Sequence, residues 1–294
     1  MRNGTTAANR QPWTGAPQVM MGGHHAASGA AAWVAVTSTA PFAFGWHPVS
    51  EVGVMTGALV CAGAALLPDA DHHSGTIAHS LPPVSEGVTK LVATVSGGHR
   101  NGTHSILGVA VFTAIAWVMG MVSISTETFG EVLVGPGVMA VLLIAFALRA
   151  WKVTGGKRWW TWTLSLLLAA CVAVFAPEEW NWMPLAVALG CTVHVLGDLV
   201  TTAGVPLLWP LKFRSPYWVR RYRVLPFDDV WRDGGNLSLP ILGDAGSWRE
   251  WLVMTPVSLY AVAGVAWAVL GQMGFDTQPV WEQVTAAWAG TFGG

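Results

Sequence analysis

Two short stretches of the chain combine carboxylates and imidazoles in a pattern typical of a divalent-metal site. The first reads Leu-Leu-Pro-Asp-Ala-Asp-His-His and contains Asp69, Asp71 and His72. The second reads His-Arg-Asn-Gly-Thr-His-Ser and runs from His99 to Ser105. Both lie beside long apolar runs, where ionisable side chains are costly and normally face a protein interior or a wet cavity. Carboxylates and neutral imidazoles bind zinc and manganese, so these stretches predict a metal site.

His194 and Asp198 form a third candidate, four residues apart in the pattern His-Val-Leu-Gly-Asp. On a helix this spacing places both side chains on one face, one turn apart, where they can hold the same ion. The alternative interpretation is a structural hydrogen bond between helices. His25, just before the first apolar run, is a further candidate ligand, and its neighbour His24 fits the same role.

The other polar residues of these stretches are expected to support the chemistry. Asp69 and Asp71 follow Pro68, and both carboxylates can turn toward one cation. One of them could instead act as a general base. The alternative interpretation is that this segment is a solvated loop at the end of a helix. Arg100 has a planar cationic side chain that can bind a phosphate group. The alternative interpretation is that Arg100 anchors the chain at the cytoplasmic side of the membrane. We expect Thr103 and His104 to accompany it, the first in substrate binding and the second as a metal ligand. Ser105 is a second substrate-binding candidate, and either hydroxyl residue can cap the following helix.

The composition indicates a membrane protein. The 294 residues are 53% hydrophobic and 11% charged, whereas soluble domains carry about 25% charged residues. The 18 Trp residues are in excess, and Trp collects at the boundary between membrane and water. The net charge of −1 gives no indication of a nucleic-acid partner, and the three cysteines lie in apolar runs without a metal-binding spacing.

The hydropathy pattern predicts an all-α, polytopic transmembrane helical bundle of about seven spans. The expected spans are residues 26–44, 52–67, 105–123, 132–148, 159–175, 183–200 and 251–270. Between the second and third, residues 80–96 are only moderately apolar and predict an interfacial helix. We expect a disordered leader over residues 1–22, a transmembrane domain over 23–272 with a cytoplasmic loop at about 201–250, and a tail over 273–294.

The distribution of basic residues predicts the orientation. A short basic loop contains Arg149, Lys152, Lys157 and Arg158, and the loop after the sixth span carries further Lys and Arg residues. These are Lys212, Arg214, Arg220, Arg221, Arg223 and Arg232. The positive-inside rule places both loops in the cytoplasm, so the N-terminus is expected inside and the C-terminus outside. All the candidate ligands then fall at the cytoplasmic ends of their spans, where they can converge as bundle metal sites require.

At these residues the chain resembles the YdjM-type membrane-bound metal-dependent hydrolases. The resemblance rests on the His before the first span and on the patterns around Asp69, His99 and His194, together with Gly-Val-Pro-Leu-Leu-Trp-Pro at residues 204–210. It covers roughly residues 20–210 and implies a multi-span protein with a hydrolase-type metal centre. The family is remotely similar to zinc-dependent phospholipase C proteins, which implies phosphoester chemistry. Relatives often have Pro where this chain has His73, so we treat His73 as incidental.

The sequence therefore predicts a metal-dependent hydrolase in a bacterial inner membrane. We expect zinc first and manganese next, and a lipid or lipid-linked phosphoester as substrate at the cytoplasmic face. Metal-activated water would be the nucleophile, and Arg100 would stabilise charge on a phosphoryl oxygen. The expected metal ligands are His25, Asp69, Asp71, His72, His99, His104, His194 and Asp198. Two alternatives use the same residues: a metal-ion or proton transporter, and a structural protein whose metal holds helices together.

Overall fold

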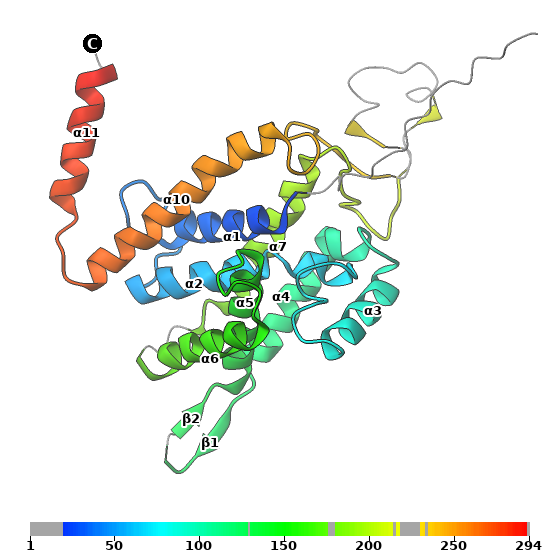
Figure 1. Ribbon diagram of the computed structural model, residues 1–294, viewed down its shortest axis with the longest axis horizontal. Coiled ribbons are helices and arrows are strands. Elements are labelled where there is room, and N and C mark those ends of the chain that lie inside the picture. Colours follow the sequence, from blue (N-terminus) through cyan, green and yellow to red (C-terminus); the bar gives the residue numbers. More distant parts are fainter. Residues whose placement is uncertain are drawn as a thin grey trace, which may run out of the picture.

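The structure is a computed structural model that describes residues 20–128, 130–175, 180–213, 216–217, 230–232 and 235–292. It is mostly helical (Figure 1). The α-helices are α1 (Gly22–Thr37), α2 (Glu51–Ala64), α3 (Val84–Ser96), α4 (Ile106–Gly120), α5 (Val134–Ala150), α6 (Arg158–Phe175), α7 (Met183–Leu199), α10 (Trp248–Gln272) and α11 (Gln278–Phe292). Two short 3-10 turns, η1 (Leu67–Asp71) and η2 (Gly102–His104), interrupt the helical pattern.

The centre of the bundle is built from α1, α2 and α7, which pack against one another, with α5 and α10 packed on α2 and α1 (Figure 1). Glycines allow this close approach. A Cβ atom at Gly29 of α1 would lie 2.5 Å from the Cys61 carbonyl oxygen of α2, and one at Gly190 of α7 would lie 2.7 Å from the same oxygen. Two helices therefore lie against one turn of α2, just before the chain enters η1.

The outer helices present apolar side chains to their surroundings. Within α4, all of which the structure describes, Gly108 and Ala116 are the buried residues, while Ile106, Val111 and Trp117 are exposed. The long helix α10 is likewise exposed along most of its apolar length. Contiguous apolar surface of this kind is rare on soluble monomers and is expected of helices that contact lipid.

The prediction of about seven spans is not confirmed. Each of the seven predicted segments forms a helix, but among the described residues two helical segments are long and apolar enough to cross a membrane. These are residues 51–71 and 248–272. Three other apolar helices, α4, α5 and α7, have 15 to 17 residues. At 1.5 Å per residue such helices extend about 23–26 Å, short of a hydrocarbon core of about 30 Å.

Other parts of the chain differ from the sequence-based expectations in detail. Met20 is buried and α1 begins at Gly22, so packing starts before the predicted domain boundary at residue 23. The predicted interfacial segment contains a helix, α3, and its position at a membrane interface stays a prediction. A β-hairpin of β1 (Ile124–Thr126) and β2 (Gly130–Val132), and the helix α11 in the predicted tail, were not anticipated. Both project from the bundle in Figure 1.

Several expectations fall on residues that the structure does not describe. The leader up to residue 19 lies outside the described residues, as do Arg214, Arg220, Arg221 and Arg223 of the basic loop. The described parts of that loop fold back on themselves, because Val205 pairs with Leu237 and Thr201 pairs with Gly243. The predicted orientation of the two termini stays a prediction.

Candidate metal centre

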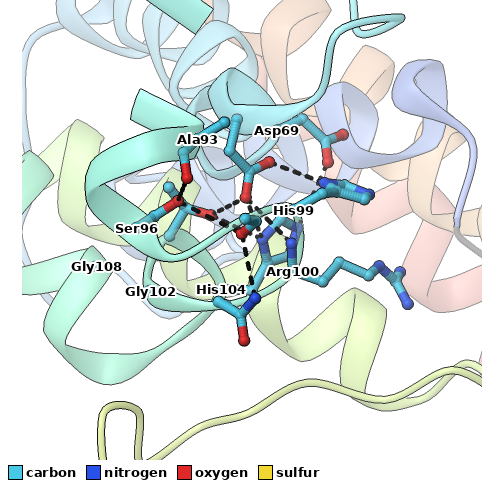
Figure 2. Close-up of polar contacts among 12 residues, drawn as sticks. Asp69, Ala93, Ser96, His99, Arg100, Gly102, His104 and Gly108 are labelled. Carbon is cyan, nitrogen blue, oxygen red and sulfur yellow. Dashed lines mark hydrogen bonds and ion pairs between the residues drawn. The ribbon is translucent and has the colours of Figure 1, made fainter. Parts of the chain in front are cut away.

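Four segments that are distant in sequence meet at one end of the bundle. The helix α2 ends at Ala64, and Pro68 lies in the first turn of η1. Proline is tolerated there because the first N–H groups of a helix make no hydrogen bond within it. The turn carries Asp69, which faces the loop containing His99, Arg100 and His104 (Figure 2). The last turns of α7 and the first turn of α1 close the other sides, with His194, Asp198 and His25.

Hydrogen bonds fix the protonation of the two central histidines. Nδ1 of His194 lies 2.6 Å from the Ala65 carbonyl oxygen, which only accepts, so Nδ1 carries the proton and Nε2 has a free lone pair. The Thr103 hydroxyl donates to Asp71 at 2.6 Å and accepts from Nδ1 of His104 at 3.0 Å. The Nε2 atom of His104 is therefore also an acceptor in the neutral ring.

These two acceptor atoms face each other. Nε2 of His104 and Nε2 of His194 are 3.2 Å apart, and both rings are fully buried. Two facing lone pairs repel unless a cation lies between them, either a metal ion or an additional proton on one ring. Carboxylate oxygens of Asp69 and Asp198 each lie 3.4 Å from Nε2 of His104 and 3.8 Å from Nε2 of His194. All four atoms are acceptors, so this group favours a cation.

The spacing of these atoms fits a divalent metal. Ligands bound to zinc at about 2.1 Å in tetrahedral geometry are about 3.4 Å from one another. The five separations that involve an imidazole nitrogen, 3.2–3.8 Å, bracket that value. Asp69, His104 and His194 form one candidate group of three ligands, and His25, His194 and Asp198 form another. One buried oxygen of Asp198, Oδ1, also has no hydrogen-bond partner among the residues that the structure describes. The residues present therefore fit a zinc or manganese ion.

The structure separates the roles of the two adjacent histidines at the start of α1. His25 is buried, stacks on His194 with ring centroids 3.8 Å apart, and lies 3.3 Å from Oδ1 of Asp198. His24 points elsewhere: its Nδ1 lies 2.5 Å from Glu250 of α10, and its ring contacts Trp251. His25 is thus the one of the pair that lies in the cluster.

Asp71 and His99 form a second group next to the first. Nδ1 of His99 donates to Asp71 at 2.9 Å, and the other Asp71 oxygen accepts from the Arg100 backbone N–H and from Thr103. Asp71 is buried, and it thereby orients two imidazoles, His99 directly and His104 through Thr103. An oxygen of Asp69 lies close enough to Asp71 and His99 for these three to share an ion.

Arg100 lies at the edge of the cluster. Its guanidinium donates to Asp198 at 2.6 Å and to the Gly204 carbonyl at 3.5 Å. Its backbone is left-handed, with φ of 58°, a conformation that costs about 1–3 kcal/mol for a non-glycine residue and persists where the surroundings require it. Two hydrogen bonds explain this conformation: Arg100 donates to Asp71 through its backbone N–H and to Asp198 through its side chain.

Two predicted site residues have other partners. His72 lies beside His99, with ring centroids 4.2 Å apart, but belongs to none of the candidate metal groups in the described chain. Its Nδ1 accepts from the Ser74 N–H. Partial burial, followed by repulsion from His99, lowers the pKa of His72. Ser105 caps α4, as one of the two expected capping residues, and its buried hydroxyl is used by the Gly108 N–H and the Gly102 carbonyl. A substrate-binding role for Ser105 stays a prediction.

The Gly-Val-Pro-Leu-Leu-Trp-Pro stretch covers the loop that carries the site. The Leu207 carbonyl accepts from the first N–H of α4, that of Ile106. A Cβ atom at Gly102 would lie 3.0 Å from the Trp209 ring. A larger residue at position 102 would have to displace the Trp209 ring, so the stretch packs closely on the loop that carries the site.

Glu250 was missed by the sequence-based analysis. It is fully buried and accepts from the Met21 and Gly246 N–H groups as well as pairing with His24. The available signal was Ser247 three residues before it, the pattern of a helix N-terminal capping box. Ser247 does cap α10, but this local pattern gives no indication of the long-range contact with α1.

Comparison with known protein families matches residues 20–273 to the family described as YdjM inner membrane protein. The match spans every residue of the cluster and all helices from α1 to α10. Comparison with curated proteins and with solved structures found no match. The two long apolar helices and the apolar outer faces agree with a membrane location. The chain therefore belongs to the YdjM inner membrane protein family.

Proposed function

We propose that this protein is a metal-dependent hydrolase that cleaves a phosphoester of a lipid or lipid-linked substrate at the membrane surface. The observation that carries the proposal is the pair of facing Nε2 atoms of His104 and His194, 3.2 Å apart, with two carboxylates around them. In this interpretation Asp69, His104 and His194 would hold one ion, and His25 and Asp198 form a neighbouring group with His194. Asp71 and His99, together with Asp69, would be the ligands of a second ion.

The chain's own residues would divide the remaining tasks. A divalent ion in this site supplies a Lewis acid that lowers the pKa of water and polarises a phosphoryl oxygen. Asp69 is the carboxylate that reaches solvent, so it is the better candidate for general base; Asp71 is held by three hydrogen bonds and positions the imidazoles. Arg100 would stabilise negative charge on the phosphoryl group.

The cluster is open on one side, which favours catalysis over a purely structural metal. The side chains of His104 and His194 are inaccessible, while those of Asp69 and His99 are 28% and 33% exposed. Structural metal sites are usually closed, whereas catalytic sites keep a position for water or substrate. The exposed edge lies between Asp69 and His99.

The helix α3 supports a lipid substrate. It packs against η1 and η2 of the site. Its exposed face carries an apolar stripe at helical spacing, formed by Val84, Val88, Leu91 and Val95, whereas Ser85, Thr89 and Ser96 face the protein. An amphipathic helix with an exposed apolar stripe is expected to lie in the membrane interface. It would hold the exposed edge of the cluster at the level of the lipid headgroups.

The first experiment measures metal content by mass spectrometry on the full chain purified in detergent. Wild type is expected to contain stoichiometric zinc or manganese, and His104→Gln and Asp198→Asn to lose it while keeping their helical content. His47→Gln is the matched control, because His47 is exposed and outside the cluster. Absence of metal from reconstituted wild type would contradict the proposal.

The second experiment measures hydrolysis of anionic phospholipid vesicles and of small phosphodiesters, followed as release of the alcohol and the phosphomonoester. Arg100→Gln is expected to lower kcat by about 10²–10³, as for loss of an electrostatic stabiliser. Asp69→Asn should also abolish turnover. Metal-loaded protein that hydrolyses neither type of substrate would instead favour the metal as a link between helices.

A further inference from the structure

A second cavity of the molecule lies on the other side of α1 from the cluster. It is a groove of about 1120 Å³ between α1, α2 and α10. Its walls are mostly small or apolar, and include Ala27, Ala58, Ala261 and Val265. Ligand-binding cavities usually occupy about 300–1,000 Å³, so the groove is large enough for a lipid-sized molecule.

One end of the groove is polar and cationic. Thr76, Arg149 and Lys152 line both the groove and an adjoining pocket of about 490 Å³. The other walls of that pocket include two hydroxyl residues, Thr154 in the turn between α5 and α6 and Thr161 in the first turn of α6. Neither Arg149 nor Lys152 has an ion-pair partner within the described part of the chain. A pair of uncompensated cations beside hydroxyl groups suits a phosphate.

The groove has the proportions of a membrane lipid. Along α10 its lining runs from Trp251 to Ala266, about 22 Å at 1.5 Å per residue. This is longer than half of a hydrocarbon core of about 30 Å. At the cationic end the Trp151 indole donates to the Gly23 carbonyl at 3.1 Å, which ties the end of α5 to the start of α1. The cationic end therefore lies at the same end of the bundle as the metal cluster.

We propose that this groove binds an anionic phospholipid, with the phosphate at Arg149 and Lys152 and an acyl chain between α1, α2 and α10. The positive charges of Arg149 and Lys152 complement an anionic headgroup, and the apolar walls of the groove suit an acyl chain. The site is distinct from the cluster, because His24 and not His25 lines it. The proposal goes beyond the hydrolase activity and does not depend on it.

The test is lipid titration of the delipidated full chain by native mass spectrometry. Phosphatidylglycerol is expected to bind roughly tenfold or more tightly than phosphatidylcholine with the same acyl chains, since charge-assisted hydrogen bonds to phosphate are strong. Arg149→Gln combined with Lys152→Gln should remove this preference. Equal binding of the two lipids by wild type would overturn the proposal.

A matched double variant separates a specific site from general surface charge. Lys157→Gln with Arg158→Gln removes the same charge from the same turn, but neither residue lines the groove. It should keep the preference for phosphatidylglycerol. An equal loss in both double variants would show nonspecific attraction and overturn the site. Helical content by circular dichroism serves as the folding control, and it is expected to stay at the wild-type value.

Two further measurements test the position of the acyl chain. Ala266→Trp places a ring in the groove, whereas Ala263→Trp places one on the exposed face of the same helix outside it. Phosphatidylglycerol affinity should fall in the first variant alone, and equal affinities would contradict the placement. Glycerol phosphate should not displace the lipid, because it lacks the chain; displacement would assign the pocket to free phosphate instead.

Discussion

The Thr103 hydroxyl group connects a carboxylate to an imidazole at the centre of the cluster. It donates to Asp71 and accepts from Nδ1 of His104, so it determines which nitrogen of His104 is free to bind metal. Groups in this position orient ligands and raise their basicity, and their loss typically lowers metal affinity 10- to 100-fold. A residue that touches no metal can therefore control binding.

We predict that Thr103→Val lowers zinc affinity by about 10- to 100-fold. Valine keeps the shape but neither donates nor accepts, so His104 loses its orientation. Thr103→Ser should restore affinity, because it restores the hydroxyl. Competition with a chromogenic chelator measures the effect. Thr113→Val is the control, since the Thr113 hydroxyl bonds within its own helix. Wild-type affinity in Thr103→Val would contradict this role.

At the scale of elements, the site depends on how closely the helices approach α2. Gly63 of α2 is the tightest of these contacts, because a Cβ atom there would lie 1.9 Å from the Leu143 carbonyl oxygen of α5. The atom is backbone and cannot rotate away. A larger residue must push α5 from α2 and displace the end of α2 that leads into η1.

We predict that Gly63→Ala destabilises the protein by about 1–3 kcal/mol, the usual range for overpacking. Gly87→Ala in α3 is the matched comparison, because its Cβ atom would meet open space. Both variants gain helix propensity, about 0.5–1 kcal/mol, so their difference isolates the contact. Thermal unfolding in detergent measures it. Equal melting temperatures would contradict tight packing at Gly63.

At the scale of the whole molecule, the orientation in the membrane is the main prediction that geometry leaves open. The acidic hairpin of β1 and β2 precedes α5, and the basic turn that leads to α6 follows it, so the two lie at opposite ends of this helix. The positive-inside rule places the first in the cytoplasm and the second outside. The cluster and the lipid groove then face the cytoplasm.

Single-cysteine labelling in intact cells tests this orientation. In a Cys171→Ser background, with Cys61 and Cys191 buried, a membrane-impermeant maleimide should label Glu127→Cys. It should label Lys157→Cys after permeabilisation alone. Labelling of Lys157→Cys in intact cells, with protection of Glu127→Cys, would reverse the predicted orientation. Labelling of both after permeabilisation is the control for accessibility.

The sequence alone was sufficient for the helical class, the membrane family and the residue types of the candidate site. Apolar runs between turn residues mark helices, and each predicted span contains one. Pairs close in sequence were also predictable, because His194 and Asp198 share a helix face by local geometry. The number of spans could not be predicted in this way, because apolar runs extend beyond the helices. The first run reaches residue 44, for example, whereas α1 ends at Thr37.

The tertiary structure alone decided which side chains meet and in what protonation state. His104 and His194 are 90 residues apart, and they meet because α4, which follows η2, packs against α7. Spacing could not choose between His24 and His25, because adjacent helical residues point in different directions and the positions of α7 and α10 make the choice. The free lone pairs likewise follow from Ala65 and Thr103, whose partners are set by packing between distant segments.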